Sequence, residues 1–103
     1  MKNRVIVRAM AEADIAHAMR WYDEQRSRLG HVFLLEVKST LAQIAQNPLR
    51  YPRVRTRPEV RRALCARFPY RIFFMHRESD VMVFRVLHSA RADREWKKNI
   101  QSD

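Results

Sequence analysis

Two apolar runs near the carboxyl end, residues 71–75 and 81–87, restrict the possible folds of this chain more than any other feature. Both are rich in Val, Ile and Phe, and only a polar tetrapeptide (Arg-Glu-Ser-Asp) lies between the ends of their strands. A third run, residues 63–66, precedes them and is divided from the first by a Phe-Pro pair. Short runs of this kind are typical of β-strands, and connections this short can join only antiparallel neighbours. The chain is therefore predicted to form a three-stranded antiparallel meander between residues 61 and 94.

A short strand and a first helix are predicted ahead of the meander. Residues 5–7 (Val-Ile-Val) form the strand. From Ala11 onwards, apolar side chains recur at a spacing that places them on one helix face: Ile15, Ala18, Met19 and Tyr22. Gly30 is the only glycine, and it lies where this helix should stop. It is therefore predicted to be a C-cap in the left-handed conformation.

A second helix is predicted from about residue 31 to residue 46, where an Asn-Pro pair stops it. Its apolar stripe consists of Phe33, Val37, Leu41 and Ile44. Two helices joined by a tight turn form an antiparallel hairpin, and here both stripes also need the sheet as a partner. Residues 49–59 contain two prolines and four arginines without any strand or helix period, and they are predicted to be a surface loop. A short final helix is predicted at residues 93–99, with Trp96 as its anchor.

The pairing within the meander follows if its turns are tight. The facing pairs are then Arg67 with Tyr70, Cys65 with Ile72, Ile72 with Arg85, and Phe74 with Val83. Alternation places Ala63, Cys65, Arg67, Tyr70, Ile72, Phe74, Val83, Arg85 and Leu87 on one face. The other face carries Arg62, Leu64, Ala66, Arg71, Phe73, Met75, Met82, Phe84, Val86 and His88. Because this second set is bulkier and lacks a charge in mid-sheet, it is predicted to meet the helices. The first set would then form a concave face bearing Arg67 and Arg85, although a slip of one residue would exchange the faces.

Length and composition predict one globular domain, residues 1–103, and the predicted order of strands and helices places it in the α+β class. The chain has 103 residues, of which 47% are hydrophobic, and this suits a single modest core. No run approaches the roughly 20 apolar residues that a membrane span needs. Cys65 is the only cysteine and cannot form an internal disulfide. The expected compartment is the cytoplasm.

The charge points to an anionic partner. The chain has 21 basic and 11 acidic residues, a formal net charge of +10, and all but four of the basic residues are arginine. Arginine binds carboxylates and phosphates through two parallel hydrogen bonds. The partner would be nucleic acid or an acidic protein, and the alternative is a solvated basic surface. The predicted partner-binding residues are Trp21, Arg53, Arg55, Arg57, Arg61, Arg67 and Arg85.

Other constellations give little support for metal or cofactor chemistry. The four histidines are scattered, without a cysteine or carboxylate at ligand spacing, so no metal site is predicted. Glycine-rich phosphate loops are absent, and no cofactor is expected. Cys65 lies in the middle of a predicted strand and is expected to be a buried small hydrophobe.

The order of strand, helix hairpin, basic segment and three-stranded meander resembles the RelE/ParE superfamily of bacterial toxin–antitoxin toxins. The segments that carry the resemblance are WYDEQRSRLG at 21–30, NPLRYP at 47–52, RRALCARFPYRIFF at 61–74 and RVLHSARADREW at 85–96. The Trp-Tyr helix, the Phe-Pro-Tyr hinge and the terminal Val-Leu-His-x-x-Arg are similar to the ParE-type branch, often described as plasmid-stabilisation proteins. The resemblance implies a toxin neutralised by an antitoxin encoded beside it.

The two branches of this superfamily imply different targets. The ParE branch poisons DNA gyrase by trapping the cleaved DNA complex without enzymatic turnover. This is the favoured hypothesis, with an acidic, partly disordered antitoxin as the partner. The RelE branch cuts messenger RNA in the ribosomal A site, using basic residues of the concave sheet and commonly a C-terminal tyrosine.

A ribosome-dependent endoribonuclease is the alternative, and a plain basic nucleic-acid-binding module is a third hypothesis. For the nuclease, Arg67, Arg85, His88 and Arg91 would supply the cations and one titratable imidazole. However, residues 93–96 contain no tyrosine, and Arg61 and Arg62 stand where the RelE branch has a lysine-rich strand. His88 is predicted instead to hold the last strand to the following turn through a hydrogen bond.

Overall fold

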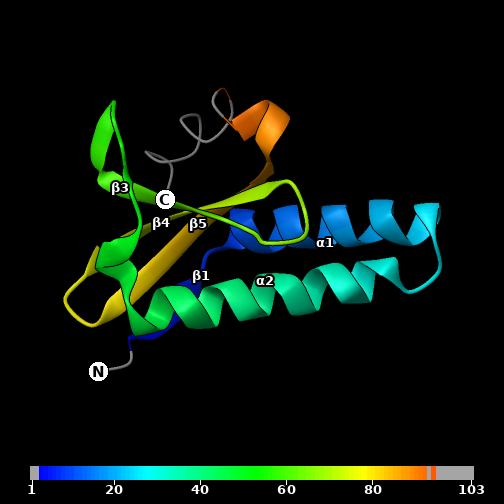
Figure 1. Cartoon of the computed structure of the whole chain (residues 1–103), viewed down its shortest axis with the longest axis horizontal. Helices are drawn as coiled ribbons and strands as arrows, with labels where there is room; N and C mark the ends of the chain where they lie inside the picture. Colours follow the sequence, from blue (N-terminus) through cyan, green and yellow to red (C-terminus); the bar gives the residue numbers. More distant parts are fainter. Residues whose placement is uncertain (1–2, 93, 95–103) are drawn as a thin grey trace.

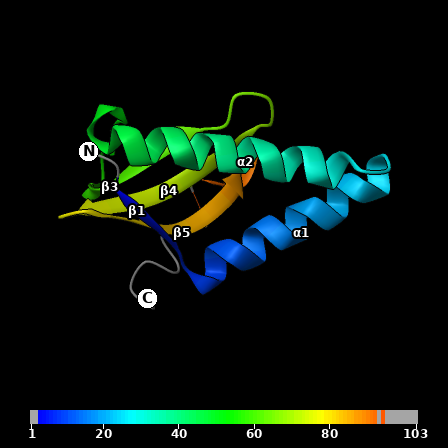
Figure 2. The ribbon, with the colours of Figure 1, turned by 90° about the horizontal axis from the view of Figure 1, so that it is seen from below.

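The computed structural model describes residues 3–92 and 94, and it places two helices on one face of a five-stranded sheet (Figures 1 and 2). The elements are β1 (Arg4–Val7), α1 (Ala9–Gln25), α2 (Leu29–Gln46), the 3₁₀ turn η1 (Pro48–Arg50), β2 (Arg53–Val54), β3 (Arg57–Leu64), β4 (Tyr70–Arg77) and β5 (Asp80–His88). The strand order is β1-β5-β4-β3-β2, with β1 parallel to β5 and the other pairs antiparallel. The predicted α+β class, first strand, helix hairpin and meander are confirmed.

The hydrophobic core lies between the helices and what we call the inner face of the sheet. Its buried residues include Phe33, Val37 and Ile44 of α2 and Ile72 and Phe74 of β4. A second, smaller cluster lies on the opposite, outer face and consists of Val54, Val60, Phe73, Phe84, Leu87 and Ala92. The sheet is therefore apolar on both faces, and this is why sequence alternation alone could not decide which face meets the helices.

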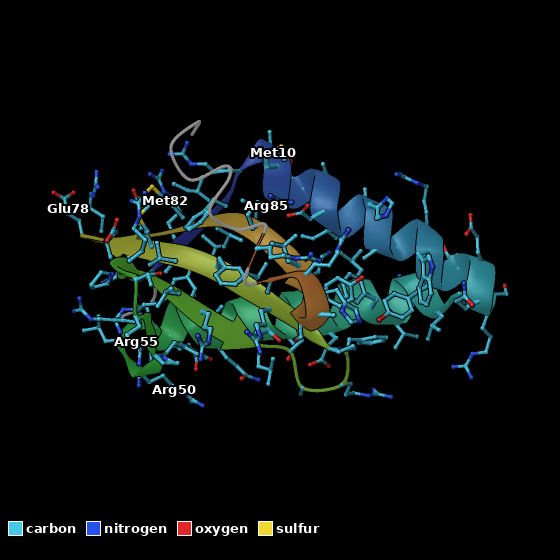
Figure 3. All side chains as sticks on the ribbon, turned by 90° about the horizontal axis from the view of Figure 1, so that it is seen from above. Met10, Arg50, Arg55, Glu78, Met82 and Arg85 are labelled. Carbon is cyan, nitrogen blue, oxygen red and sulfur yellow. The ribbon has the colours of Figure 1, made fainter. Side chains whose placement is uncertain are left out.

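The predicted assignment of the two faces is wrong. Most of the first set packs against the helices: Ala63, Cys65, Tyr70, Ile72, Phe74 and Val83 all belong to the inner cluster. The two charges that argued against this arrangement do not lie on the inner face of the sheet. Arg67 lies in the loop after β3, and Arg85 extends from the edge of β5 toward α1 (Figure 3). The first set is therefore not a concave functional face.

The strand register differs from the prediction at two places. Between β3 and β4, Ala63 rather than Cys65 faces Ile72, and Cys65 N–H donates to the carbonyl of Tyr70. The register differs because a loop over residues 66–69, not a tight turn, connects the two strands. Between β4 and β5, the predicted pair of Phe74 with Val83 is confirmed.

A β-bulge then shifts the register, so that Phe73 faces Arg85 and Ile72 faces Val86. The additional residue is Phe84, and such a bulge redirects the side chains that follow it.

The segment predicted as a loop, residues 49–59, contains β2 and the beginning of β3. Val54 and Val60 are buried in the outer cluster and hold this hairpin on the sheet. Two prolines and alternating arginines conceal the strand pattern in the sequence, because arginines can occupy the exposed positions of an edge hairpin. The meander is therefore four-stranded rather than three-stranded.

Gly30 is not the C-cap of the first helix. α1 ends at Gln25, and the left-handed residue of the turn is Arg28, with φ 71°. Gly30 lies in the first turn of α2, where a Cβ atom would come within 2.8 Å of Asp23 Oδ1 and would also meet the carbonyl oxygen of Met19. Its N–H donates to Asp23 Oδ1 at 2.7 Å. The glycine is therefore required by the close approach of the two helices, not by backbone conformation.

The predicted final helix at residues 93–99, with Trp96, lies outside the described residues apart from Arg94. Residues 89–92 are helical, and Ala92 packs into the outer cluster. Among the described residues, no helix is both long and apolar enough to cross a membrane.

Candidate functional site

Arg85 is part of a buried ion pair that joins β5 to α1 (Figure 3). β1 pairs with β5 only as far as Val83, and α1 covers the next part of that edge. Asp14 Oδ2 accepts hydrogen bonds from Arg85 Nε at 2.7 Å and from the backbone N–H of Val86 at 2.9 Å. Asp14 Oδ1 accepts a third from Arg85 Nη2 at 2.9 Å. Only 6% of Arg85 is exposed, so this candidate binding residue lies in the interior.

One candidate site is an aromatic groove of about 450 Å³ between α1 and the end of β5. It is lined by His17, Trp21, Tyr22, Pro69, Tyr70, His88 and Arg91. Trp21 is 51% exposed, as its position beside the buried stripe predicts. Burial raises the pKa of Tyr22 and of Tyr70, so both phenols stay protonated at neutral pH. The groove therefore presents aromatic surface, imidazoles and one guanidinium.

His88 makes the hydrogen bond that the sequence predicts. Its Nδ1 accepts the backbone N–H of Ala90 at 3.1 Å, which ties the end of β5 to the following helical turn. Neutral His88 therefore carries its proton on Nε2. Its ring also packs edge-on against Tyr70, with ring centroids 5.3 Å apart.

The four candidate nuclease residues do not converge on one site. His88 and Arg91 line the aromatic groove. Arg85 is buried against Asp14, and Arg67 is exposed in the loop after β3 and does not line the groove. A general acid or base and its supporting cations must all reach one phosphate, and this arrangement provides only two of the four side chains.

The remaining predicted arginines lie around the β2–β3 hairpin. Arg57 pairs with Glu59 at 3.1 Å, and Arg53 Nη1 donates to the carbonyl of Pro58 at 3.2 Å. Arg61 Nη1 donates to the carbonyl of Tyr51 at 2.7 Å. Partial burial, together with the nearby cation of Arg53, lowers the pKa of Arg61. These contacts hold several guanidiniums close together at one end of the sheet.

Arg55 lies in the turn of this hairpin and is exposed. Figure 3 shows Arg50 and Arg55 at the edge of the molecule opposite Met10 and α1. The predicted set is thus divided among four places: the β2–β3 hairpin, the loop after β3 for Arg67, the aromatic groove for Trp21, and the interior for Arg85.

An arginine cleft, which the sequence does not predict, lies on the outer side of this hairpin. It has a volume of about 450 Å³ and is lined by Arg50, Tyr51, Pro52, Arg62, Leu64 and Arg71. The predicted alternation places Arg62 and Arg71 on the helix-facing side of the sheet, so the sequence does not indicate them as binding residues. The presence of two arginines on a predicted core face indicates that this face is exposed, because buried arginines are rare unless they are paired.

An apolar hairpin groove of about 390 Å³ follows the two helices. It is lined by Val7, Glu12, Ile15, Ala16, Met19, Leu34, Val37, Lys38 and Leu41. Several of these are the stripe residues that neither helix can cover alone, and Ile15, Met19, Leu34 and Leu41 are only partly buried. The groove has the character of a surface that receives apolar side chains from a partner.

No candidate metal site is present in the part of the chain that the structure describes. Within residues 3–92 and 94, no three His, Cys, Asp or Glu side chains come together in a way that could hold a metal ion.

Cys65 is buried, as predicted, and its thiol is expected to be unreactive. Burial raises its pKa to about 11. At pH 8 roughly one thiol in a thousand would then be ionised, against about a quarter for an ordinary cysteine. Because Cys65 is the only cysteine, its reaction with a chromogenic disulfide reports on this site alone. We expect at least a roughly 100-fold slower reaction in the folded chain than in urea. Similar rates in both states would contradict this.

Comparisons with known proteins agree with this architecture. A family model described as the ParE toxin of the type II toxin-antitoxin system, parDE, matches residues 5–93. No curated protein matches the chain in sequence. Among solved structures, the fold is similar to a chain from a chromosomal ParDE TA system from P. aeruginosa, with a TM-score of 0.75 and 15% identity. That likeness covers 84% of this chain and 96% of the other.

Proposed function

The chain belongs to the ParE toxin family of type II toxin–antitoxin systems, and from this premise we propose that it inhibits DNA gyrase without enzymatic turnover. The observation that supports a binding toxin over a nuclease is the position of Arg85. Its guanidinium forms two hydrogen bonds with Asp14 inside the protein and is not available to a substrate phosphate. A toxin that acts by occupying its target needs surfaces rather than a converged set of catalytic groups.

The antitoxin of this system is proposed to be acidic and partly disordered before it binds. Its apolar side chains would enter the hairpin groove, which offers Ile15, Met19 and Leu34 as partly exposed contacts. Its carboxylates would meet the excess of positive charge, +10 over the chain. The disordered segment of the antitoxin would then become ordered when it binds to the toxin. The compartment proposed for this encounter is the cytoplasm.

A supercoiling assay with purified gyrase tests the proposal. We expect the chain to inhibit supercoiling and to cause cleaved DNA to accumulate when the reaction is stopped with detergent and protease. Because a basic protein can also coat DNA, the same titration is made with a type I topoisomerase as a control. Inhibition of both enzymes without cleaved DNA would exclude the gyrase proposal and would favour a nucleic-acid-binding module, whose affinity falls steeply with salt.

Two matched variants locate the contact surface. Arg55→Glu reverses an exposed charge in the turn of the β2–β3 hairpin, and Arg20→Glu makes the same charge change on α1. We expect Arg55→Glu to need about tenfold more toxin for half-inhibition, since one such step corresponds to about 1.4 kcal/mol of binding. Arg20→Glu should stay within about twofold of the natural chain. Equal losses would show that only total charge matters.

The second candidate function is a ribosome-dependent endoribonuclease, and one observation favours it: His88 and Arg91 line the same aromatic groove. Primer extension on translated messages would then show codon-phased cuts that disappear in His88→Gln and Arg91→Gln. Arg85→Ala is unsuitable for this test because it would leave Asp14 unpaired in the interior. If the natural chain makes codon-phased cuts, the gyrase proposal is rejected in favour of the endoribonuclease.

A further inference from the structure

The arginine cleft lies where the outer edge of β3 is no longer covered. The last hydrogen bond described on that edge runs from Arg62 N–H to the carbonyl of Pro52 at 3.2 Å. Proline has no N–H, so it cannot extend the pairing as a donor. On the other side of β3, Cys65 N–H donates to the carbonyl of Tyr70. By alternation, the N–H and C=O of Leu64 point to the edge that β2 leaves open.

The cleft therefore occupies the line along which β2 would continue. Leu64 lines it, and β2 is the last strand of the sheet on that side among residues 3–92 and 94. The open edge is short, because Glu36 Oε2 already accepts the backbone N–H of Ala66 at 2.9 Å. Backbone pairing alone would bind a strand weakly here, so side chains must contribute most of the affinity.

Three guanidiniums from separate elements surround this edge. Arg50 comes from η1, Arg62 from β3 and Arg71 from β4, and none of the described lining residues is Asp or Glu. Arg62 pairs with Phe73 across the strands and Leu64 pairs with Arg71, which places these side chains on the outer face. Three guanidinium groups this close together favour an anionic ligand that carries more than one negative charge, because each guanidinium can form two parallel hydrogen bonds with a carboxylate or phosphate.

The exposed apolar surface at the cleft favours a peptide over nucleic acid. Leu64, which lines the cleft, is 64% exposed, the largest value among the large hydrophobic residues of the described part. Phosphates would satisfy the arginines but would leave this aliphatic side chain in water. A peptide strand with alternating acidic and aliphatic residues would cover both, because its side chains alternate between two directions.

We propose that the arginine cleft binds an acidic peptide segment in extended conformation, which adds to the edge of β3 at Leu64. The carboxylates of the segment pair with Arg50, Arg62 and Arg71, and its aliphatic side chains cover Leu64. The inference rests on the proposed function in one respect, since it takes the segment to belong to the antitoxin. This surface is separate from the hairpin groove, which lies along the helices.

The binding test uses the full chain and two labelled probes. One probe is a seven-residue peptide of alternating Glu and Val with blocked ends, and the other is a ten-residue oligothymidine. Binding is followed by fluorescence polarisation and by amide chemical shifts of the ¹⁵N-labelled chain. We expect the peptide to shift the amides of Leu64 and Arg71. Arg62→Glu should weaken the peptide at least tenfold, and Arg20→Glu, with the same change in net charge, less than twofold.

Each contrary outcome overturns the proposal. Equal weakening by Arg62→Glu and Arg20→Glu would show attraction by net charge alone. Shifts confined to the hairpin groove would place the peptide elsewhere, and shifts at Leu64 caused only by oligothymidine would make the cleft a nucleic-acid site. Gyrase is not present in these measurements, so failure of peptide binding and failure of gyrase inhibition are separate results.

Discussion

Asp14→Ala is expected to lower the free energy of unfolding by about 3–5 kcal/mol, the usual cost of removing one partner of a buried ion pair. The change leaves Arg85, only 6% exposed, without its carboxylate. It also removes the acceptor of the Val86 N–H, which lies on the part of the β5 edge that β1 does not cover. For a domain of about 100 residues, a loss of this size lowers Tm by more than about 10 °C.

Urea unfolding followed by circular dichroism measures this loss, with Asp80→Ala as the matched control. Asp80 pairs with Arg4 at 3.2 Å, but that pair is exposed, so its removal should cost less than about 1 kcal/mol. The double variant Asp14→Ala with Arg85→Met should be more stable than Asp14→Ala alone, because no charge is left buried. Equal effects of Asp14→Ala and Asp80→Ala would show that the Arg85 ion pair is not buried in solution.

Gly30→Ala is expected to destabilise the chain by about 2–3 kcal/mol, although alanine is the better helix former by about 1 kcal/mol. The added methyl group would meet the carbonyl of Met19 and come within 2.8 Å of Asp23 Oδ1. The first of these is backbone, so α1 and α2 must separate to make room. Their separation would weaken packing around Phe33, which stacks on Tyr22 with centroids 5.3 Å apart.

The sign of the Gly30→Ala effect tests whether the two helices pack closely at this residue. Denaturant unfolding of Gly30→Ala is compared with Ser39→Ala, an exposed position on the same helix that should change stability by only a few tenths of a kcal/mol. A gain in stability for Gly30→Ala would mean that the two helices do not contact each other closely at Gly30 in solution.

Two kinds of surface emerge from the fold, and they suit different parts of one partner. The hairpin groove is mainly apolar, and the arginine cleft lies around an open strand edge. A disordered antitoxin that reaches both would gain affinity from linking two weak contacts.

The sequence by itself determined the types and order of the elements, apart from β2 and the beginning of β3. Helical spacing from Ala11 onwards, the Asn-Pro stop after α2 and the apolar runs of β4 and β5 are local signals, and local backbone preferences decide them. The hydrogen bond of His88 to the turn after it could be predicted for the same reason, since its partner is two residues away.

Only the tertiary structure decided which face of the sheet meets the helices and which arginines reach solvent. Both faces are apolar, so the register and the bulge at Phe84 determine where each side chain points, and neither depends on local spacing. Arg85 is internal because Asp14, 71 residues earlier, lies opposite it. Arg62 lines the cleft because β2 begins beside it and leaves the rest of the β3 edge open. Such pairings join distant parts of the chain, and their energies exist only once the elements have packed.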